Sequence, residues 1–238
     1  MTETISYKKQ TGQIKDLAPM KKTGIALDAC MACGTCSAGC PVAGTSGFDP
    51  RKIIRMILLG QEKELVESNL PWLCTMCAKC DYACPMGINI AGTIRTIRSQ
   101  VDRDNVPSTI QKGIGLCQET GNNIGLRKAD FEFIIEDAVD DLVEEEPEWE
   151  NLEVPMDKKG ANLLHTLHNK LVNTQTEDIV HWWKIFDQAN ESWTITSENW
   201  EGVNWGMFSG DDNAMKIIVG RIVEQMTKLE IANLMYPE

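Results

Sequence analysis

Hydrophobic residues in the first half of the chain recur at helical spacing. The first such stretch follows Asp49 and Pro50, which suit an N-cap and the first position of a helix. Gly60 is a suitable residue for ending this helix, and a short polar helix is expected after it, over residues 61–68. The apolar face of the first helix consists of Ile53, Ile54, Ile57 and Leu58.

Three longer helices are predicted between residues 90 and 145, each from apolar residues three and four positions apart. One face of the first helix carries Ile90, Ile94, Ile97 and Val101. The second should begin near Pro107 and bury Ile110, Ile114 and Cys117, so we expect Cys117 to be a small core residue and not a metal ligand. A turn over residues 121–125 separates it from the third helix, over residues 128–145. The inward face of that helix should contain Phe131, Ile134, Ile135, Ala138 and Leu142.

The last third of the chain alternates between strand and helix patterns. Strands are predicted over residues 161–167, 193–196 and 231–235. Thr174 and Glu177 resemble a capping box for a helix between the first two strands, and a long helix over residues 211–229 precedes the third. This β-α-β-α-β order implies a small parallel sheet with right-handed crossovers. The inward residues of the two helices should be Ile179, Trp183, Phe186, Met215, Ile218, Ile222, Val223 and Met226.

These patterns divide the chain into four segments. A polar N-terminal arm covers residues 1–24 and a helical domain residues 25–146. A linker follows over residues 147–155, where the composition changes, and residues 156–238 form a partial α/β lobe. The expected fold is therefore mainly α, followed by the small lobe.

The charge of the chain excludes one class of partner. Its 35 acidic residues outnumber its 23 basic ones, which gives a formal net charge of −12. Binding to nucleic acid needs a basic surface, so we expect no nucleic-acid partner. The acidic run around Glu145 is interpreted as a solvated helix end and linker rather than a docking patch. No apolar run approaches a membrane span and the N-terminus lacks the pattern of a signal peptide, which favours a cytoplasmic protein that reaches a membrane only through a partner.

Eight of the nine cysteines lie in two runs with the same spacing, C-x2-C-x2-C-x3-C-P. This is the bacterial ferredoxin signature for a [4Fe-4S] cluster. The segment between the runs is helical in pattern, where small ferredoxins have strands, so the helical-ferredoxin type of domain is expected. The first run contains Cys30, Cys33, Cys36 and Cys40, and the second Cys74, Cys77, Cys80 and Cys84.

The spacing predicts two [4Fe-4S] clusters that share the two runs. In two-cluster ferredoxins the fourth cysteine of each run binds the other cluster. The predicted ligands of the first cluster are therefore Cys30, Cys33, Cys36 and Cys84. Those of the second are Cys74, Cys77, Cys80 and Cys40. Disulfides would require a secreted chain, and structural zinc would leave the third cysteine and the Cys-Pro step of each run unexplained.

Other candidate residues are given ordinary roles. The three histidines, His165, His168 and His181, are interpreted as strand or helix residues with ordinary hydrogen bonds, and a metal role is the alternative. Arg95 and Arg98 are interpreted as surface arginines, with a partner contact near the clusters as the alternative. No Gly-x-Gly-x-x-Gly or Walker sequence supports a nucleotide site. The tryptophans of the last third are expected in the core or an interface: Trp182, Trp183, Trp193, Trp200 and Trp205.

Residues 25–125 resemble the dicluster iron–sulfur subunit of heterodisulfide reductase. They also resemble the matching N-terminal part of the larger subunit of that enzyme, which contains a Cys-Cys-Gly half. The resemblance lies in the two cysteine runs and in the stretches DPRKIIRM (49–56), PWLC (71–74) and CPMGI (84–88). It continues through SWTI (192–195) and NWGMFSGD (204–211), which are similar to the start of the Cys-Cys-Gly half and of the related membrane-complex subunit of sulfate reducers.

This resemblance implies an electron-transfer subunit of a heterodisulfide-reductase-like complex, which relays single electrons and has no catalytic residue of its own. The implied partners are a flavoprotein or membrane cytochrome that donates electrons and a catalytic Cys-Cys-Gly half or subunit that reduces a disulfide. This chain ends at Glu238, before the cysteine-rich motifs of that half. A split gene, a truncated form and a selenocysteine codon read as a stop all remain open.

Two alternative functions remain. The iron–sulfur subunits of succinate, glycolate and anaerobic glycerol-phosphate oxidation look similar across the cysteine runs, although residues 192–211 favour the disulfide-reductase branch. A structural zinc scaffold is the second alternative.

Overall fold

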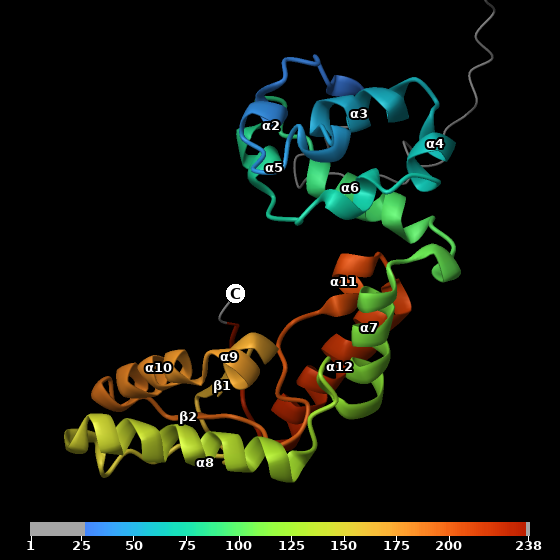
Figure 1. Ribbon diagram of the computed structural model, residues 1–238. Coiled ribbons are helices and arrows are strands. Elements are labelled where there is room, and N and C mark those ends of the chain that lie inside the picture. Colours follow the sequence, from blue (N-terminus) through green and yellow to red (C-terminus); the bar gives the residue numbers. More distant parts are fainter. Residues whose placement is uncertain (1–26, 237–238) are drawn as a thin grey trace, which may run out of the picture. The chain divides into compact units, whose positions relative to one another are not determined.

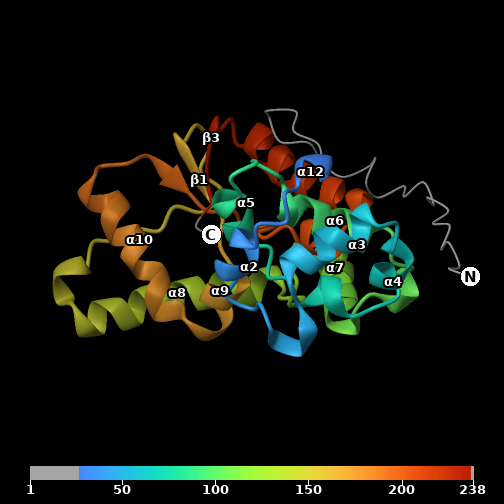
Figure 2. The same cartoon turned by 90° about the horizontal axis from the view of Figure 1, so that it is seen from above.

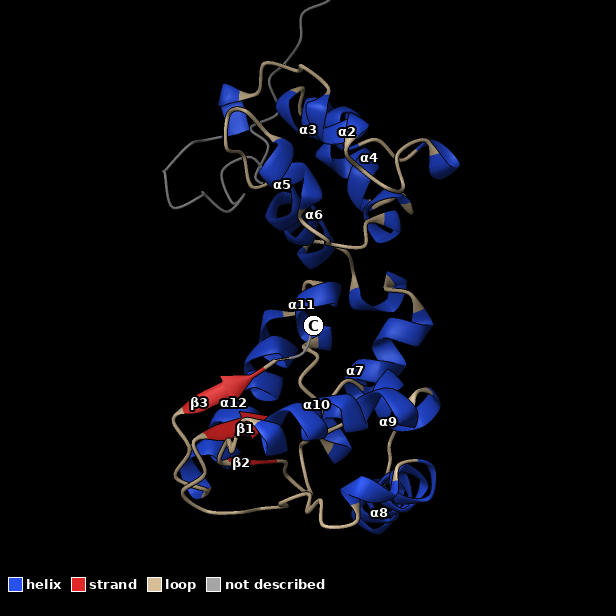
Figure 3. Ribbon diagram, turned by 90° about the vertical axis from the view of Figure 1, so that its left-hand side faces the viewer, coloured by secondary structure: helices blue, strands red, loops and turns tan. Residues whose placement is uncertain are grey.

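The computed structural model describes residues 27–236, so the expected arm over residues 1–24 lies outside the described residues. The chain forms two compact units, and the first is discontinuous in sequence. It contains the described residues up to Pro107 together with Met207–Asp211, and the second contains Ser108–Gly206 and the residues from Asp212 onward. Helices dominate both units, as expected, and the strands form one small sheet (Figure 3).

The first unit is built from short helices around the two cysteine runs (Figure 1). Its helical elements from the continuous part of the chain are η1 (Leu27–Ala29), α2 (Thr35–Ala38), η2 (Thr45–Gly47), α3 (Pro50–Leu58), α4 (Glu62–Val66), η3 (Leu70–Leu73), α5 (Lys79–Ala83), α6 (Ile90–Ser99) and η4 (Arg103–Asn105).

The start of α3 confirms the predicted cap. The Asp49 carboxylate accepts a hydrogen bond from the Lys52 backbone N–H at 3.1 Å, which satisfies one of the free N–H groups of the first turn. After the helix, Gly60 has a φ of 76°, the left-handed conformation that commonly ends helices. Ile53, Ile54 and Ile57 are buried as predicted.

The apolar faces of α3 and α6 form the core of the first unit. All four residues predicted to face inward from α6 and its end are buried: Ile90, Ile94, Ile97 and Val101. The helical part of this set packs with Phe48 and Leu65, and α4 contacts both helices. Cys80 belongs to this core and five further cysteines pack against it, so the two runs rest on a hydrophobic base.

The second unit combines longer helices with the sheet. Its elements in chain order are α7 (Ser108–Thr120), α8 (Lys128–Glu145), η5 (Pro147–Trp149), β1 (Leu163–His165), α9 (Asn169–Thr174), α10 (Thr176–Gln188), β2 (Trp193–Thr194), α12 (Asp212–Lys228) and β3 (Asn233–Met235). The short helix α11 (Trp205–Ser209) contains the boundary between the two units.

The three strands are parallel and lie in the order β2-β1-β3, visible in Figure 3. Leu163 pairs with both Trp193 and Asn233, which fixes the register. All three strands are shorter than the sequence pattern predicts. Additional single bridges, Met156 to Ile195 and Leu167 to Glu201, lie beyond the strand ends, so the apolar alternation extends past the regular ladder.

Helices α8 and α10 contact one another and enclose an aromatic core. Phe131 stacks on Trp200 with ring centroids 4.8 Å apart, and Trp183 is fully buried beside Trp193. The predicted inward positions of the large side chains Phe131 and Trp183 on these helices are therefore confirmed. On α12 the prediction fails at Val223, which is 53% exposed.

The capping-box prediction at Thr174 is wrong. The Thr174 hydroxyl donates to the Lys170 carbonyl at 3.1 Å and closes α9, a short helix that the sequence pattern missed. Helix α10 begins only at Thr176 and has no side-chain cap at Gln175. A hydroxyl that bonds back to the preceding turn is unavailable to cap the next helix.

The expected ordinary hydrogen bonding is wrong for His165. Its side chain is fully buried at the end of β1, and neither ring nitrogen has a hydrogen-bond partner. The rings of Phe186 and Trp193 lie 5.3 and 6.2 Å from its ring. Burial lowers the pKa of His165 to about 4, so the ring is neutral at pH 7. His168 does behave as expected, because its Nδ1 accepts from the Lys170 N–H at 2.8 Å and caps α9.

Candidate metal centre

The two cysteine runs have the same backbone shape. In the first, Ala32 and Gly34 have positive φ angles of 55° and 86°. In the second, Met76 and Ala78, at the same positions of the motif, have φ angles of 58° and 57°. Non-glycine residues rarely adopt this conformation, and such strain is typically found at functional sites. Each loop is followed at once by a short helix, α2 or α5, that contains the third cysteine of its run.

The left-handed turns direct backbone N–H groups toward sulfur. The Met76 N–H donates to Cys74 Sγ at 3.3 Å, and the Ile88 N–H donates to Cys84 Sγ at 3.5 Å. Hydrogen bonds of this kind stabilise thiolates and tune the potential of an iron–sulfur cluster.

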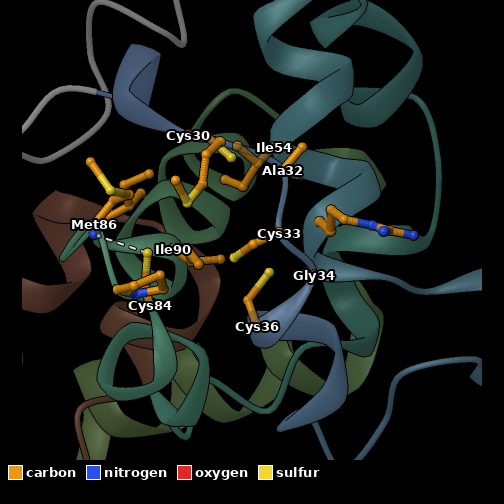
Figure 4. Close-up of a pocket in the computed structure, with 13 residues that line it drawn as sticks. Cys30, Ala32, Cys33, Gly34, Cys36, Ile54, Cys84, Met86 and Ile90 are labelled. Atoms are coloured by element: carbon orange, nitrogen blue, oxygen red, sulfur yellow. Dashed lines mark hydrogen bonds between the residues drawn. The ribbon is translucent and has the colours of Figure 1, made fainter.

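Cysteines of both runs line one small cavity. Three of them, Cys30, Cys33 and Cys36, come from the first run, and Cys84 is the last cysteine of the second (Figure 4). Helices α2 and α5 lie side by side, which brings the runs together, as Figures 1 and 2 both show. The apolar part of the wall includes Ile54, Met86, Ile88 and Ile90.

The four cysteines that line this cavity suit a four-iron cluster. Such a cluster binds each thiolate on a different iron, so its ligands surround a space instead of meeting at a point. Four cysteines around one apolar space meet this requirement. Within residues 27–236, no three His, Cys, Asp or Glu side chains meet at a point where a single metal ion could bind.

The other four predicted ligands lie near one another around Cys74. Burial raises the pKa of the Cys74 thiol, and the thiols of Cys40 and Cys77 raise it further. The pKa of Cys80 rises to about 12 because of burial and the neighbouring Asp81 and Cys74. A thiol must lose its proton to bind metal. Burial disfavours the resulting thiolate until a bound metal offsets its negative charge.

The exposed cysteines show the opposite shift. A hydrogen bond with the Thr35 side chain lowers the pKa of Cys33, and one from the Lys79 backbone N–H lowers that of Cys77. Each run therefore presents one exposed thiol that ionises easily, at the second cysteine of its motif.

Two aspartates, which the sequence analysis did not identify as part of the site, fix the runs to helices. The Ser37 hydroxyl, next to Cys36, donates to Asp49 at 2.5 Å, so the residue that caps α3 also holds the first run. Asp81, next to Cys80, accepts from the Ile90 and Ala91 N–H groups at 2.6 and 3.0 Å and caps α6. In the sequence, both aspartates could have been found from the residue that follows the third cysteine of each run. This residue is Ser37, the hydrogen-bond partner of Asp49, in the first run, and Asp81 itself in the second.

Arg98 also belongs to the site, and its interpretation as a surface arginine is wrong. Its side chain is only 2% exposed. It donates to the carbonyls of Pro71, Cys74 and Phe208, and its guanidinium lies 5.1 Å from the centre of the Trp72 ring. Arg95 is half-buried and donates to the Met207 carbonyl at 3.1 Å.

Comparison with known proteins agrees with this geometry. Residues 26–88 match the family model described as a 4Fe-4S dicluster domain. The corresponding subunit of a ferredoxin/F(420)H(2)-dependent CoB-CoM heterodisulfide reductase from Methanosarcina acetivorans is 30% identical over 133 residues, which cover 54% of this chain and 82% of that protein. This chain belongs to the family of heterodisulfide reductase iron–sulfur subunits.

Other members of the family match over shorter parts. The corresponding subunit of the H(2):CoB-CoM heterodisulfide,ferredoxin reductase from Methanothermobacter marburgensis is 27% identical over 111 residues, 46% of this chain and 60% of that protein. The iron-sulfur subunit of the CoB--CoM heterodisulfide reductase from Methanopyrus kandleri is 33% identical over 75 residues, 32% of this chain and 39% of that protein. The chain thus spans less than two thirds of the length of these two relatives.

Cys117, the ninth cysteine, is buried in α7 as predicted, and its thiol donates to the Glu201 carboxylate at 3.3 Å. Burial and this carboxylate raise the pKa of the Cys117 thiol. In the part of the chain that the structure describes, no helix combines the length and the apolar character needed to cross a membrane.

Proposed function

We propose that this chain is the iron–sulfur electron-transfer subunit of a heterodisulfide-reductase-like complex and holds two [4Fe-4S] clusters. The cavity shared by the two cysteine runs is the observation that carries the proposal. Membership of the heterodisulfide reductase family and the match to a dicluster domain support it. When bound, each cluster would accept and release one electron at a time.

The ligands of the first cluster are proposed to be Cys30, Cys33, Cys36 and Cys84. The apolar wall of their cavity would keep water from the sulfurs, and the Ile88 N–H would stabilise the charge on Cys84. Because Cys84 comes from the other run, this set joins α2 to α5. Loss of one ligand should therefore loosen both runs.

The ligands of the second cluster are proposed to be Cys74, Cys77, Cys80 and Cys40. The thiols of Cys40 and Cys77 raise the pKa of Cys74, and the Cys74 thiol raises the pKa of Cys80, so these thiols are close enough to interact, which supports this set. Deprotonation of these thiols would place negative charge in a buried site, and positive iron would offset the cost of that charge. The folding of the second run would therefore be coupled to binding of its cofactor.

The proposed partners follow from the family. The acceptor would be a catalytic Cys-Cys-Gly half or subunit that reduces a disulfide, and the donor a flavoprotein or a membrane cytochrome. The names of the relatives specify a CoB-CoM heterodisulfide for those proteins. For this chain we propose the same class of substrate, a mixed disulfide, bound by the partner and not by this subunit, in a cytoplasmic complex.

Iron analysis of anaerobically purified protein tests the proposal. We expect about eight iron and eight sulfide per chain and a broad absorption near ~400 nm. Cys36→Ala should lose about half of the iron, whereas the matched control Cys117→Ala should retain all of it. Zinc without iron, or full iron retention in Cys36→Ala, would contradict the assignment.

Reoxidation by a partner tests the wider role. After reduction, the protein should be reoxidised by a purified disulfide-reducing subunit of a heterodisulfide reductase with a mixed disulfide as the final electron acceptor, followed as recovery of absorption near ~400 nm. In the comparison, the oxidised protein is mixed with the flavoprotein of a succinate or glycolate dehydrogenase and its substrate, and loss of the same absorption reports reduction. Reduction by the dehydrogenase without reoxidation by the disulfide-reducing subunit would favour the alternative function.

A further inference from the structure

Arg98 places a positive charge inside the first unit, beside the second cysteine run. Its Nη2 donates to the carbonyl of Cys74, and Nη2 and Nε both donate to the carbonyl of Pro71, at 2.8 and 3.0 Å. The Trp72 ring covers the guanidinium at 5.1 Å. The cation is thus held against the backbone of the segment that leads into the first cysteine of the run.

A discontinuous segment completes the pocket of Arg98. Nη1 donates to the carbonyl of Phe208 at 2.6 Å, and this residue belongs to the segment Met207–Asp211. Arg95 and Arg103 donate to the carbonyls of Met207 and Ser209. Three arginines from α6 and the chain just after it therefore bind three consecutive carbonyls, and the segment covers Arg98 from water.

Among residues 27–236 the charge of Arg98 has no carboxylate partner. Its hydrogen-bond partners among the described residues are the carbonyls of Pro71, Cys74 and Phe208, which are all neutral. A buried cation without an anion is destabilising. In the metal-bound protein, the thiolate of Cys74, whose charge interacts with that of Arg98, can offset this cost.

Among residues 27–236, no arginine or lysine other than Arg98 is buried, so the described part of the first run has no equivalent. Arg51 approaches Gly34 with its guanidinium, but its side chain is exposed. Water and salt screen an exposed charge, whereas a buried charge acts at low effective dielectric. The two runs share one motif and one backbone shape, yet their electrostatic surroundings differ.

We propose that Arg98 is a positioning residue whose buried charge raises the reduction potential at the second cysteine set, so that this set receives an electron before the first. The proposal rests on the two-cluster function proposed above. The chain would then hold an electron preferentially on the side of Cys74.

Redox titration monitored by electron paramagnetic resonance tests the proposal on the full, metal-loaded protein. The signal that disappears in Cys36→Ala identifies the first cluster. In the wild-type protein the other signal should appear at the higher potential. Arg98→Gln should lower the reduction potential of that signal by at least about 59 mV, which is a tenfold change in the equilibrium constant for one-electron reduction. The potential of the first cluster should stay unchanged.

Two further variants separate charge from structure. Arg98→Lys retains the charge and loses the planar fork of donors, so its shift should be less than a third of that of Arg98→Gln on the potential scale. Arg95→Gln removes a half-buried charge that binds the same segment, and should leave both potentials unchanged within about threefold in the reduction equilibrium. If Arg98→Gln loses the second cluster altogether, the comparison of Arg98→Lys with Arg95→Gln decides.

The outcomes that overturn the proposal are distinct from failure of the proposed function. A wild-type protein without iron would refute the two-cluster function itself. Iron-loaded protein in which the first cluster is reduced first would refute the role of Arg98. Equal shifts in Arg98→Lys and Arg98→Gln, or equal shifts of both signals, would do the same, because they indicate a structural effect and not a charge beside one cluster.

Discussion

Gly210→Ala should release the segment Met207–Asp211 from α6. Gly210 has a φ of 75°, and a Cβ built there would lie 2.6 Å from the Ser99 backbone nitrogen and 2.9 Å from the Arg95 carbonyl oxygen. Contacts below 3.0 Å do not occur between such atoms, and both neighbours belong to a helix backbone that cannot yield locally. The segment must therefore move away, and its carbonyls leave Arg98.

The expected magnitude has two parts. A left-handed alanine costs about 1 kcal/mol relative to glycine. Forcing a methyl group into a closed contact adds about 1–3 kcal/mol. Gly47→Ala is a matched control, because Gly47 has a φ of 80° and nothing within 4 Å of its Cβ position, so only the first part applies.

Hydrogen exchange measures the difference. In the wild-type protein the Gly210 N–H donates to the Met207 carbonyl and the Asp211 N–H to the Ser209 hydroxyl. A loss of about 3 kcal/mol corresponds to exchange on the order of 100-fold faster in peptides that cover residues 205–212. Gly47→Ala should speed exchange only near residues 44–48, by about fivefold. If the two variants accelerate exchange in their own segments equally, the close contact with α6 is refuted.

Three further predictions concern stability. Asp81→Ala should lower the free energy of unfolding by about 1–2 kcal/mol, because the Ile90 and Ala91 N–H groups lose their acceptor, and Asp81→Asn should recover most of it in anaerobic urea titrations. Equal losses in the two variants would contradict the capping role. Ile94→Ala empties a fully buried position and should cost about 2–5 kcal/mol, whereas a loss below about 1 kcal/mol would show that the core of the first unit is loose. His165 binds a proton more weakly in the folded than in the unfolded chain. Its contribution to the free energy of unfolding is therefore complete above about pH 6.5 and is lost as the pH falls toward 4. His165→Phe should flatten this acid dependence in urea titrations followed by tryptophan fluorescence, and an unchanged slope would refute it.

Local patterns predicted the helical part of the first unit well. The spacing of Ile90, Ile94 and Ile97 predicted α6, and Asp49 with Pro50 predicted the start of α3, since both signals act within a few residues. The duplicated cysteine motif pointed to the cavity residues for a related reason: the spacing itself is dictated by the cofactor. The metal-ligand assignment and the segment boundaries drawn from the sequence remain predictions.

The residues that the sequence could not place depend on distant parts of the chain. Arg98 resembles a surface residue in its own helix, and its burial depends on Pro71, 27 positions away, and on Phe208, 110 positions away. His165 lacks hydrogen bonds because Phe186 and Trp193 fold over it. The ends of the strands depend on distant residues as well, since each strand pairs with strands that a long crossover connection separates from it.

The discontinuous first unit affects how the protein is made. Ribosomes release the cysteine runs early, but the last piece of the unit that holds them, Met207–Asp211, follows about 100 residues after Pro107. At typical rates of synthesis this interval lasts roughly 5–20 s. During this interval the Phe208 carbonyl has not yet covered Arg98. Iron and sulfide delivered during translation would therefore reach the second cysteine run before the segment Met207–Asp211 packs beside it. Iron and sulfide delivered after release of the chain would reach the run with this segment in place.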